Sequence, residues 1–219
     1  MLEVIALTVA DAVAAERGGA DRLEVVADMA ADGLTPGIAE VAEIRAAVSL
    51  PIRAMLRANA GFATDARELD RLRAAAAALA EAGADGFVFG FVEGGRVDLA
   101  ATRALAEAVS PLPWTFHRAV DRAAGGWDEV RGLPGLDQIL TSGSTTTVRD
   151  GLATLLRRAE ADAALILAGG GLGAEDVPGL LAAGVTGFHV GGAVREGRSW
   201  DAPIDPGLVA TWKSLTVSG

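Results

Sequence analysis

Short apolar runs of strand length alternate along the chain with longer segments in which apolar positions recur every three or four residues. The short runs predict buried strands, and the longer segments predict amphipathic helices between them. The predicted strands span residues 2–7, 22–26, 51–56, 86–89, 113–116, 138–140, 164–167 and 187–190.

Capping residues predict where two of the helices begin and end. Residues 65–82 form the clearest amphipathic segment, with Thr64 as the expected N-cap and Gly83 as the stop. Residues 206–215 predict a last helix, which begins with proline directly after the expected capping residue Asp205.

A glycine followed two residues later by aspartate or threonine recurs before four of the predicted strands, at Gly19, Gly83, Gly135 and Gly184. Glycine adopts the left-handed conformation that ends a helix, and the aspartate can hold the turn into the strand. One such glycine precedes every second predicted strand, so the repeating unit is two strand–helix pairs.

Eight evenly spread strand–helix units without a linker predict a single-domain (β/α)8 TIM barrel over residues 1–219. The alternative is a doubly wound open sheet. The glycine fingerprint typical of a dinucleotide-binding sheet does not follow the first strand, where residues 8–11 contain no glycine. The barrel is therefore the favoured fold.

The amino-acid composition excludes several classes of functional site and partner. The hydrophobic fraction of 51% is incompatible with global disorder, and the net charge of −10 argues against a nucleic-acid partner. Without cysteine, disulfides, thiolate metal sites and cysteine nucleophiles are excluded. The lone lysine, Lys213, lies close to the C-terminus, where a Schiff-base site is hard to build. No apolar run has membrane-spanning length, so we expect a soluble cytoplasmic protein; homo-oligomerisation stays open.

The active site of a barrel lies at the carboxyl ends of its strands. Glu3 and Glu24 stand among apolar residues in the first two strands, and alternation places both on the inward face, either as ion-paired structural groups or as functional acids. Arg53 and Arg57 share the inward face of the third strand. We expect Arg53 to neutralise Glu3 or Glu24, and Arg57 to hold a ligand anion by a bidentate fork.

Two histidines fall at strand ends on inward positions. His117 follows the fifth strand and is either a general acid/base, a metal ligand or a satisfied structural histidine. His189 lies in the eighth strand, beneath a glycine-rich turn.

Small residues follow three strands and predict an anion site. Ser142 and Gly143, after the sixth strand, either cap the next helix or bind an anion there. Turns after the seventh and eighth strands are where barrels place a phosphate, although glycine turns also serve tight packing. The expected phosphate-binding glycines are Gly169, Gly170, Gly171, Gly191 and Gly192.

Ordered motifs run from Glu3 to His189 along most of the chain. They are residues 18–24 (GGADRLE), 33–36 (GLTP), 56–57 (LR), 83–90 (GADGFVFG), 97–98 (VD), 115–119 (TFHRA), 140–143 (LTSG) and 168–171 (AGGG). Together they resemble the CutC family, named for copper homeostasis. The resemblance implies a cytosolic (β/α)8 barrel linked to copper, and it implies as site residues Glu24, Arg57, His117, Arg118, Asp121 and His189.

The chain departs from the family pattern in two places. Ile5 and Val26 stand where the family commonly has cysteines, and Cu(I) prefers soft thiolate or thioether ligands, so a thiolate copper site is excluded. Residues 57–61 also lack the second arginine of the family's arginine-rich turn, which predicts a different ligand specificity.

Three functions follow from these features. The resemblance implies a copper-homeostasis protein that binds or regulates. The residues themselves favour a barrel that acts on a small phosphorylated or carboxylated metabolite, with Glu24 and His117 as acid/base groups and Arg57 as anion clamp. The third is a non-catalytic barrel kept for interaction, whose interior would be filled by glutamate–arginine pairs.

Overall fold

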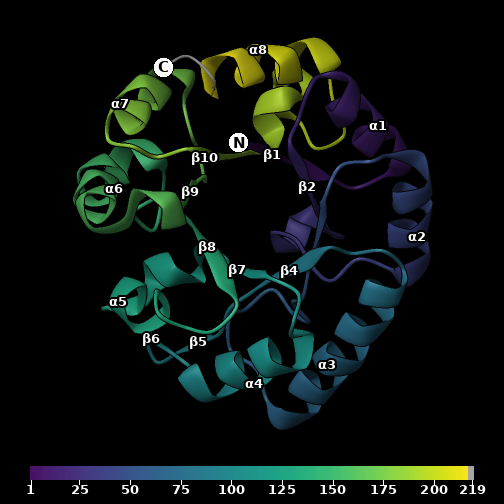
Figure 1. Ribbon diagram of the computed structural model, residues 1–219, viewed down its shortest axis with the longest axis vertical. Coiled ribbons are helices and arrows are strands. Elements are labelled where there is room, and N and C mark those ends of the chain that lie inside the picture. The colour runs from purple at the N-terminus through teal and green to yellow at the C-terminus, as the bar shows by residue number, and fades with distance from the viewer. Residues whose placement is uncertain (217–219) are drawn as a thin grey trace.

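The computed structural model describes residues 1–216, in which eight parallel strands close into a barrel surrounded by helices (Figure 1). Around the barrel the strands follow the order β1-β10-β9-β8-β7-β4-β3-β2. The predicted (β/α)8 barrel is confirmed, and the open sheet is excluded because β1 pairs with β10. The barrel strands are β1 (Leu2–Ala6), β2 (Arg22–Val25), β3 (Ile52–Met55), β4 (Gly86–Phe89), β7 (Trp114–Phe116), β8 (Leu136–Thr141), β9 (Ile166–Ala168) and β10 (Gly187–Val190).

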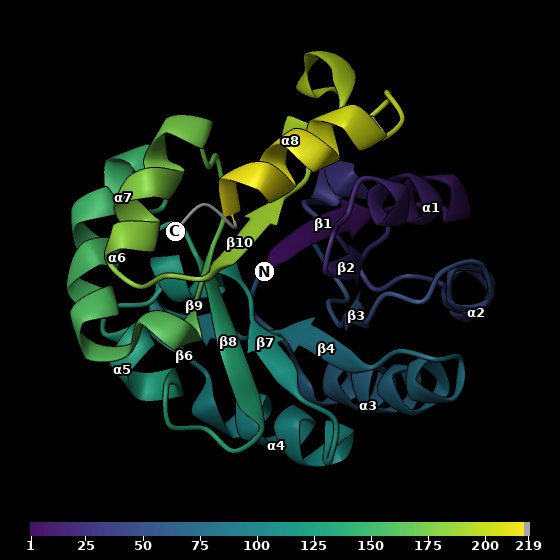
Figure 2. The same ribbon diagram turned by 45° about the horizontal axis from the view of Figure 1, so that its top comes forward.

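Helices cover the outside of the barrel, as the tilted view shows (Figure 2). In the part of the chain that the structure describes, no helix combines the length and apolar character needed to cross a membrane. The α-helices are α1 (Val9–Arg17), α2 (Ile38–Ala47), α3 (Ala66–Glu81), α4 (Leu99–Val109), α5 (Gly126–Val130), α6 (Val148–Asp162), α7 (Val177–Ala182) and α8 (Pro206–Thr216).

A small antiparallel hairpin follows β4, formed by β5 (Val92–Glu93) and β6 (Arg96–Val97). The sequence pattern did not predict it, because strands of two residues are too short to show alternation.

Side-chain caps define the ends of α3 and α8. The N-cap of α3 is Asp65 and not the expected Thr64, because Asp65 Oδ1 accepts the backbone N–H of Glu68 at 2.7 Å. At α8 the expected cap is confirmed, since Asp205 Oδ1 accepts the N–H of Gly207 at 2.7 Å.

The four repeated glycines all have the positive φ that ends a helix. The values are +88° at Gly19, +105° at Gly83, +75° at Gly135 and +86° at Gly184. Residues that carry a side chain rarely adopt this backbone conformation, so the glycine repeat in the sequence corresponds to a repeated helix-to-strand turn.

The aspartates of this repeat bind the neighbouring strand. Asp21 accepts the N–H of Leu2 at 2.6 Å, and Asp85 accepts the N–H of Ile52 at 2.9 Å. Each aspartate thereby satisfies a backbone donor at the start of an adjacent strand, which fixes the amino-terminal edge of the barrel.

The outward face of the strands is apolar and packs against the helices. On β2, Leu23 and Val25 are at most 1% exposed, and the rings of Phe89 and Trp114 stack with centroids 4.4 Å apart. Because this face packs against the helices, Glu24, which lies between Leu23 and Val25, points into the barrel.

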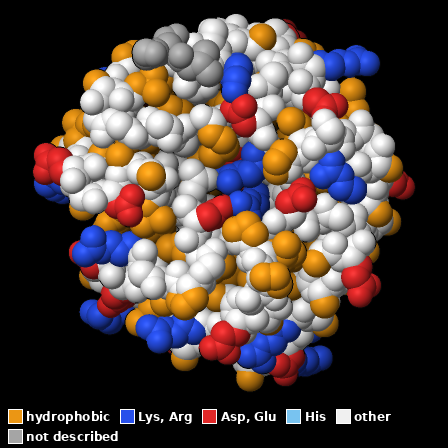
Figure 3. Space-filling view, viewed as in Figure 1, with side chains coloured by type: hydrophobic (Ala, Val, Ile, Leu, Met, Phe, Trp, Pro, Cys, Tyr) orange, Lys and Arg blue, Asp and Glu red, His pale blue; other side chains and the backbone are white. Residues whose placement is uncertain are grey.

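An ion-pair network fills the amino-terminal half of the barrel interior. Arg22 Nε donates to Glu3 Oε2 at 2.5 Å, and Arg53 pairs with Asp137. The expectation that Arg53 neutralises Glu3 or Glu24 was wrong. Glu3 is taken by Arg22, which stands opposite it in the β1–β2 register, and Arg53 pairs with Asp137 although Glu24 stands opposite it in the β2–β3 register. Viewed along the barrel, basic side chains gather at the centre of this face with acidic ones beside them (Figure 3).

Replacing Glu3 by glutamine removes the nearer charge partner of the buried Arg22 guanidinium, which keeps only Asp137 at 3.8 Å. We expect Glu3→Gln to lower the free energy of unfolding by about 3–5 kcal/mol, the cost of breaking a buried pair. Urea denaturation measures this. Asp70→Asn is the matched control, because Asp70 pairs with Arg73 at the surface and should lose less than about 1 kcal/mol. Equal losses in the two variants would contradict the interpretation.

Candidate functional site

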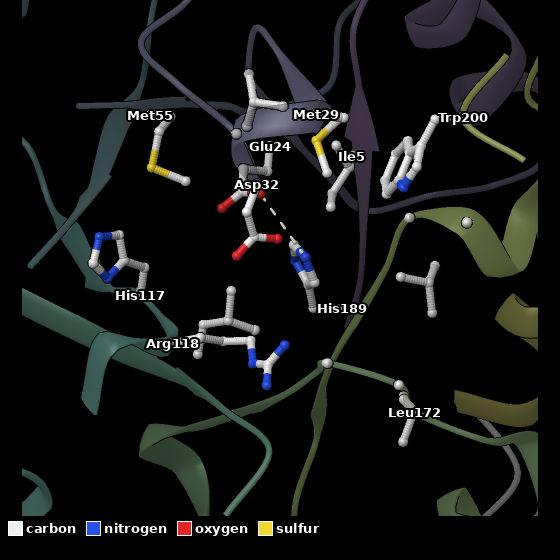
Figure 4. Close-up of a pocket in the computed structure, with 18 of the residues that line it drawn as sticks. Ile5, Glu24, Met29, Asp32, Met55, His117, Arg118, Leu172, His189 and Trp200 are labelled. Atoms are coloured by element: carbon white, nitrogen blue, oxygen red, sulfur yellow. Dashed lines mark ion pairs between the residues drawn. The ribbon is translucent and has the colours of Figure 1, made fainter. Parts of the chain in front are cut away.

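A cavity of about 280 Å³ opens at the carboxyl ends of the barrel strands. Its wall combines residues of β1, β2, β3, β8 and β10 with residues of the loops that follow β2, β3, β7, β9 and β10. Figure 4 shows Glu24, Arg118 and His189 around one space, with His117 at its side. The cavity wall thus brings these four predicted site residues together, and strand parity had placed Glu24, His117 and His189 on inward positions.

Glu24 is the buried acid of this cavity. The residue is 3% exposed, and its Oε1 has no hydrogen-bond partner among the described residues. Its Oε2 lies 3.8 Å from His189 Nε2. Burial, reinforced by the charges of Glu3 and Asp32, raises the pKa of Glu24 to about 7, although His189 opposes the shift. Glu24 is therefore poised to exchange a proton near neutral pH.

Glu3 holds His189 in place below Glu24. Glu3 Oε1 lies 2.8 Å from His189 Nδ1, and its other oxygen accepts from Arg22. Burial alone would raise the pKa of Glu3, but Arg22 and His189 lower it to about 2. Burial likewise disfavours a charged His189, yet the carboxylates of Glu24 and Glu3 raise its pKa above the ordinary value. The imidazole thus lies between two carboxylates, one on each ring nitrogen.

The surroundings of His117 shift its pKa in the direction opposite to that of Glu24. Burial and the positive charge of Arg57 lower the pKa of His117 to about 3, so the ring is neutral at physiological pH. Its Nδ1 accepts the N–H of Ala119 at 3.3 Å, which assigns the ring proton to Nε2. The ring is 4% exposed and meets Phe62 edge-on, with centroids 5.2 Å apart. His117 is therefore a fixed hydrogen-bond donor in the wall of the cavity.

Arg118 lies across the turn at Gly170. Its Nη2 donates to Ser142 Oγ at 3.2 Å and to the Thr146 carbonyl at 2.9 Å, while its buried Nε has no partner in residues 1–216. A Cβ on Gly170 would stand 2.5 Å from that Nε, and Gly170 has a φ of +91°. Glycine is thus required at position 170 for the guanidinium to reach the cavity.

Four of the predicted glycines line the cavity: Gly170, Gly171, Gly191 and Gly192. The described residues supply no acceptor for the backbone N–H groups of Gly170 and Gly171. Gly169 differs, because its N–H donates to the Thr141 carbonyl at 3.1 Å and it packs against His189. The turn after β9 therefore offers backbone donors only from its second glycine onward.

The CutC family model matches residues 1–194. The chain belongs to the CutC family. It is 36% identical over 198 residues to a CutC family protein of Xanthomonas campestris, an alignment that covers 86% of this chain and 81% of the relative. It is 33% identical over 225 residues to the human copper homeostasis protein cutC homolog, covering 100% of this chain and 82% of that protein.

Solved structures support the same fold. The copper homeostasis protein CutC of Streptococcus agalactiae, described as putative, superposes with a TM-score of 0.79 at 22% identity, covering 87% of this chain and 97% of that one. A 3-hexulose-6-phosphate synthase superposes with a TM-score of 0.67 at 19% identity over 99% of both chains. At these identities the likeness establishes the barrel alone.

Arg57 lies in the cavity wall of this CutC-family protein, but its guanidinium is occupied. Nη1 donates to three consecutive carbonyls of residues 31–33 at 2.8–3.1 Å. Nε and Nη2 donate to carbonyls of residues 60–61 at 3.2 and 2.5 Å. Arg57 therefore joins the loops after β2 and β3, and the expectation of a free fork for a ligand anion is corrected.

Asp121, Ser142 and Gly143 lie behind the cavity rather than in its wall. Asp121 accepts from Thr141 Oγ1 at 2.6 Å and from the Ser142 N–H at 2.8 Å, and it pairs with Arg158 at 3.3 Å. A side chain at Gly143 would meet a backbone oxygen of α6 at 2.5 Å. These residues pack the turn from β8 to α6, so their expected place in the site is corrected.

Sequence reasoning missed several residues of the cavity wall, among them four from two loops. Met29 and Asp32 come from the loop after β2, and Arg198 and Trp200 come from the loop after β10. A Cβ on Gly191 would lie 2.4 Å from the Trp200 ring, so this loop folds back over the glycine turn. The only indication in the sequence that these residues belong to the site was that both loops follow the carboxyl end of a strand.

Three buried residues, Glu3, Glu24 and His189, bring potential metal-ligand atoms within 4.8 Å of one another. Both oxygens of Glu3 are already engaged, one by Arg22 and one by His189. A guanidinium in contact with the group repels a cation, and we therefore assign this cluster to ion pairing and not to metal binding.

Replacing Glu24 by glutamine tests its raised pKa. Because the folded protein binds this proton more tightly than the unfolded chain, ionisation of Glu24 costs stability as pH rises from about 4.5 through 7. We expect Glu24→Gln to melt several degrees above the wild type at pH 8 and at nearly the wild-type temperature at pH 4.5. Differential scanning calorimetry at both pH values measures this. A variant less stable than the wild type at pH 8 would refute the assignment.

Proposed function

We propose that this CutC-family protein is an enzyme that binds a small phosphorylated or carboxylated metabolite at the mouth of the barrel, with Glu24 as its acid/base group. One observation carries the proposal: Glu24 Oε1 is buried in the cavity wall without a partner among the described residues. Buried polar atoms normally have partners, because leaving one unsatisfied costs free energy. A bound substrate supplies that missing partner.

The opposite side of the cavity supports an anionic substrate. Arg118 brings a guanidinium whose Nε is unpartnered in residues 1–216, next to the free backbone N–H groups of Gly170 and Gly171. This is the corner of the barrel, after the seventh barrel strand, where such folds bind phosphate. The charged groups of the site thus suit a molecule that carries an anion at one end.

A purely structural barrel would have its interior filled by ion pairs. Such pairs exist, between Glu3 and Arg22 and between Arg53 and Asp137. They occupy the amino-terminal half and leave Glu24 Oε1, at the other end, without a partner in residues 1–216. The structure therefore favours a ligand-binding barrel over one kept for interaction.

Copper handling is the second candidate, because relatives of this chain are named for copper homeostasis. The donor set of this chain does not fit a thiolate Cu(I) site, since it contains no cysteine. Ile5 and Val26, at the positions where the resemblance expects cysteines, form an apolar wall with Met55. The thioethers of Met29 and Met55 line the cavity, but their neighbours there are mainly apolar.

A small anionic molecule is thus the partner that the site supports best. The net charge of −10 argues against a nucleic-acid partner. Cytoplasmic location stays a prediction from the sequence, which leaves homo-oligomerisation open.

Removing the guanidinium of Arg118 should weaken anion binding. We expect the wild type to bind inorganic phosphate, and Arg118→Met to raise the Kd at least tenfold, as for loss of a charge-assisted hydrogen bond. Isothermal titration calorimetry measures both. Arg103→Met, on the exposed face of α4, is the matched control and should bind like the wild type. The proposal fails if phosphate, sulfate and acetate all leave the wild type unchanged.

A competition titration against a Cu(I) chelator tests the copper alternative. We expect no copper held beyond weak adventitious binding to histidine and methionine, and no difference between the wild type and Met29→Leu/Met55→Leu. One equivalent of copper retained at sub-picomolar affinity would establish a copper site and reject this expectation.

A further inference from the structure

Two groups of contrasting chemistry line the same cavity: the carboxyl group of Glu24, whose buried Oε1 has no partner among the described residues, and the neutral imidazole of His117, whose Nε2 carries a proton. We propose that the site transfers a proton between adjacent carbons of a small anionic hydroxycarbonyl compound, with Glu24 as the base and His117 as hydrogen-bond donor to the carbonyl oxygen. This inference rests on the proposed function and adds the reaction and the substrate class to it.

The position of Glu24 suits a base that acts on carbon. Its Oε1 has no hydrogen-bond partner within residues 1–216, so no hydrogen bond must break before it takes a proton. The charged groups that face it are His189 from β10, Glu3 from β1, Arg22 from its own strand and Asp32 from the loop after β2. Glu3 fixes His189 through Nδ1, which presents the other ring nitrogen to Glu24 Oε2 at 3.8 Å. Glu3 and His189 are therefore positioning residues for the base.

The tautomer of His117 decides its role. Because Nδ1 accepts from the Ala119 backbone, the neutral ring can only donate through Nε2. Arg57 lies near enough to disfavour a second proton on the ring, and its own guanidinium is fixed by backbone carbonyls. A neutral imidazole held in this way stabilises the oxyanion of an enolate without giving up its proton to solvent.

The rest of the cavity limits the substrate. Arg118 and the turn at Gly170 take the anionic end, as argued above. Ile5, Val26 and Met55 form an apolar wall that offers no hydrogen bonds to further hydroxyl groups. A volume of about 280 Å³ lies at the lower end of ligand pockets, which favours a short-chain molecule.

The reaction is balanced without a further reactant. Glu24 takes the proton from the carbon next to the carbonyl, the C–H electrons form a carbon–carbon double bond, and the carbonyl π electrons move to the oxygen that His117 Nε2–H holds. The protonated Glu24 then returns the proton to the former carbonyl carbon, and the hydroxyl proton of the neighbouring carbon moves to the enolate oxygen. Substrate and product are isomers. Glu24 and His189 lie together, so the base acts from one face, which favours transfer between carbons over inversion at one carbon.

Deuterium exchange tests the reaction. The wild type in D2O is incubated with dihydroxyacetone phosphate and with hydroxyacetone phosphate, and proton NMR follows loss of the C–H signal next to the carbonyl. We expect exchange above the buffer rate, a loss of at least 100-fold in Glu24→Gln, and wild-type exchange in Arg103→Met. His117→Leu should lose exchange, and His117→Gln, which keeps an N–H donor, should recover part of it. Absence of exchange with both probes overturns the assigned reaction.

A second measurement does not depend on the choice of substrate. 2-Phosphoglycolate resembles the planar enediolate, and its carboxylate should bind best when Glu24 is protonated. We expect its Kd to rise about tenfold per pH unit above pH 7 in the wild type, relative to inorganic phosphate, and this extra slope to vanish in Glu24→Gln. If phosphoglycolate binds like phosphate at every pH, the inference fails while anion binding stands. If neither ligand binds, the proposed function itself fails.

Discussion

The buried carboxylate of Glu3 links the two halves of the barrel interior. One oxygen receives Arg22 and the other faces His189, so a single side chain ends the ion network of the amino-terminal half and begins the site of the carboxyl-terminal half. Strand register imposes this arrangement, because Glu3 stands opposite Arg22 on β2 and opposite His189 on β10. A buried charge of this kind persists only when both oxygens are paired, and here both are.

Desolvation acts on the two site residues in opposite directions. Burial disfavours the charged form of each group, so it raises the pKa of Glu24 and lowers that of His117. The carboxyl becomes a group that titrates near neutrality, and the imidazole becomes a permanent neutral donor. The difference in chemistry between the two residues thus arises chiefly from one property that both side chains share, their burial from water.

The loops after the strands supply the rest of the cavity wall. Arg57 ties the loops after β2 and β3 together through five carbonyl oxygens, and this places Asp32 in the cavity wall. The loop after β10 returns Trp200 over Gly191. The cavity therefore depends on hydrogen bonds between a side chain and the loop backbone as well as on its reactive groups, which is typical of a site assembled on the ends of a rigid barrel.

The sequence by itself determined the barrel, because alternation of strands and helices and the glycines that end helices are local signals. Strand parity also placed Glu24, His117 and His189 inside, since the apolar neighbours of each residue must face the helices. The sequence could not predict which groups pair with the charged side chains. Arg53 pairs with Asp137, and Arg57 donates to backbone carbonyls and not to a ligand. Such pairings depend on the stagger between strands and on how loops fold back, and only the tertiary structure sets those distances.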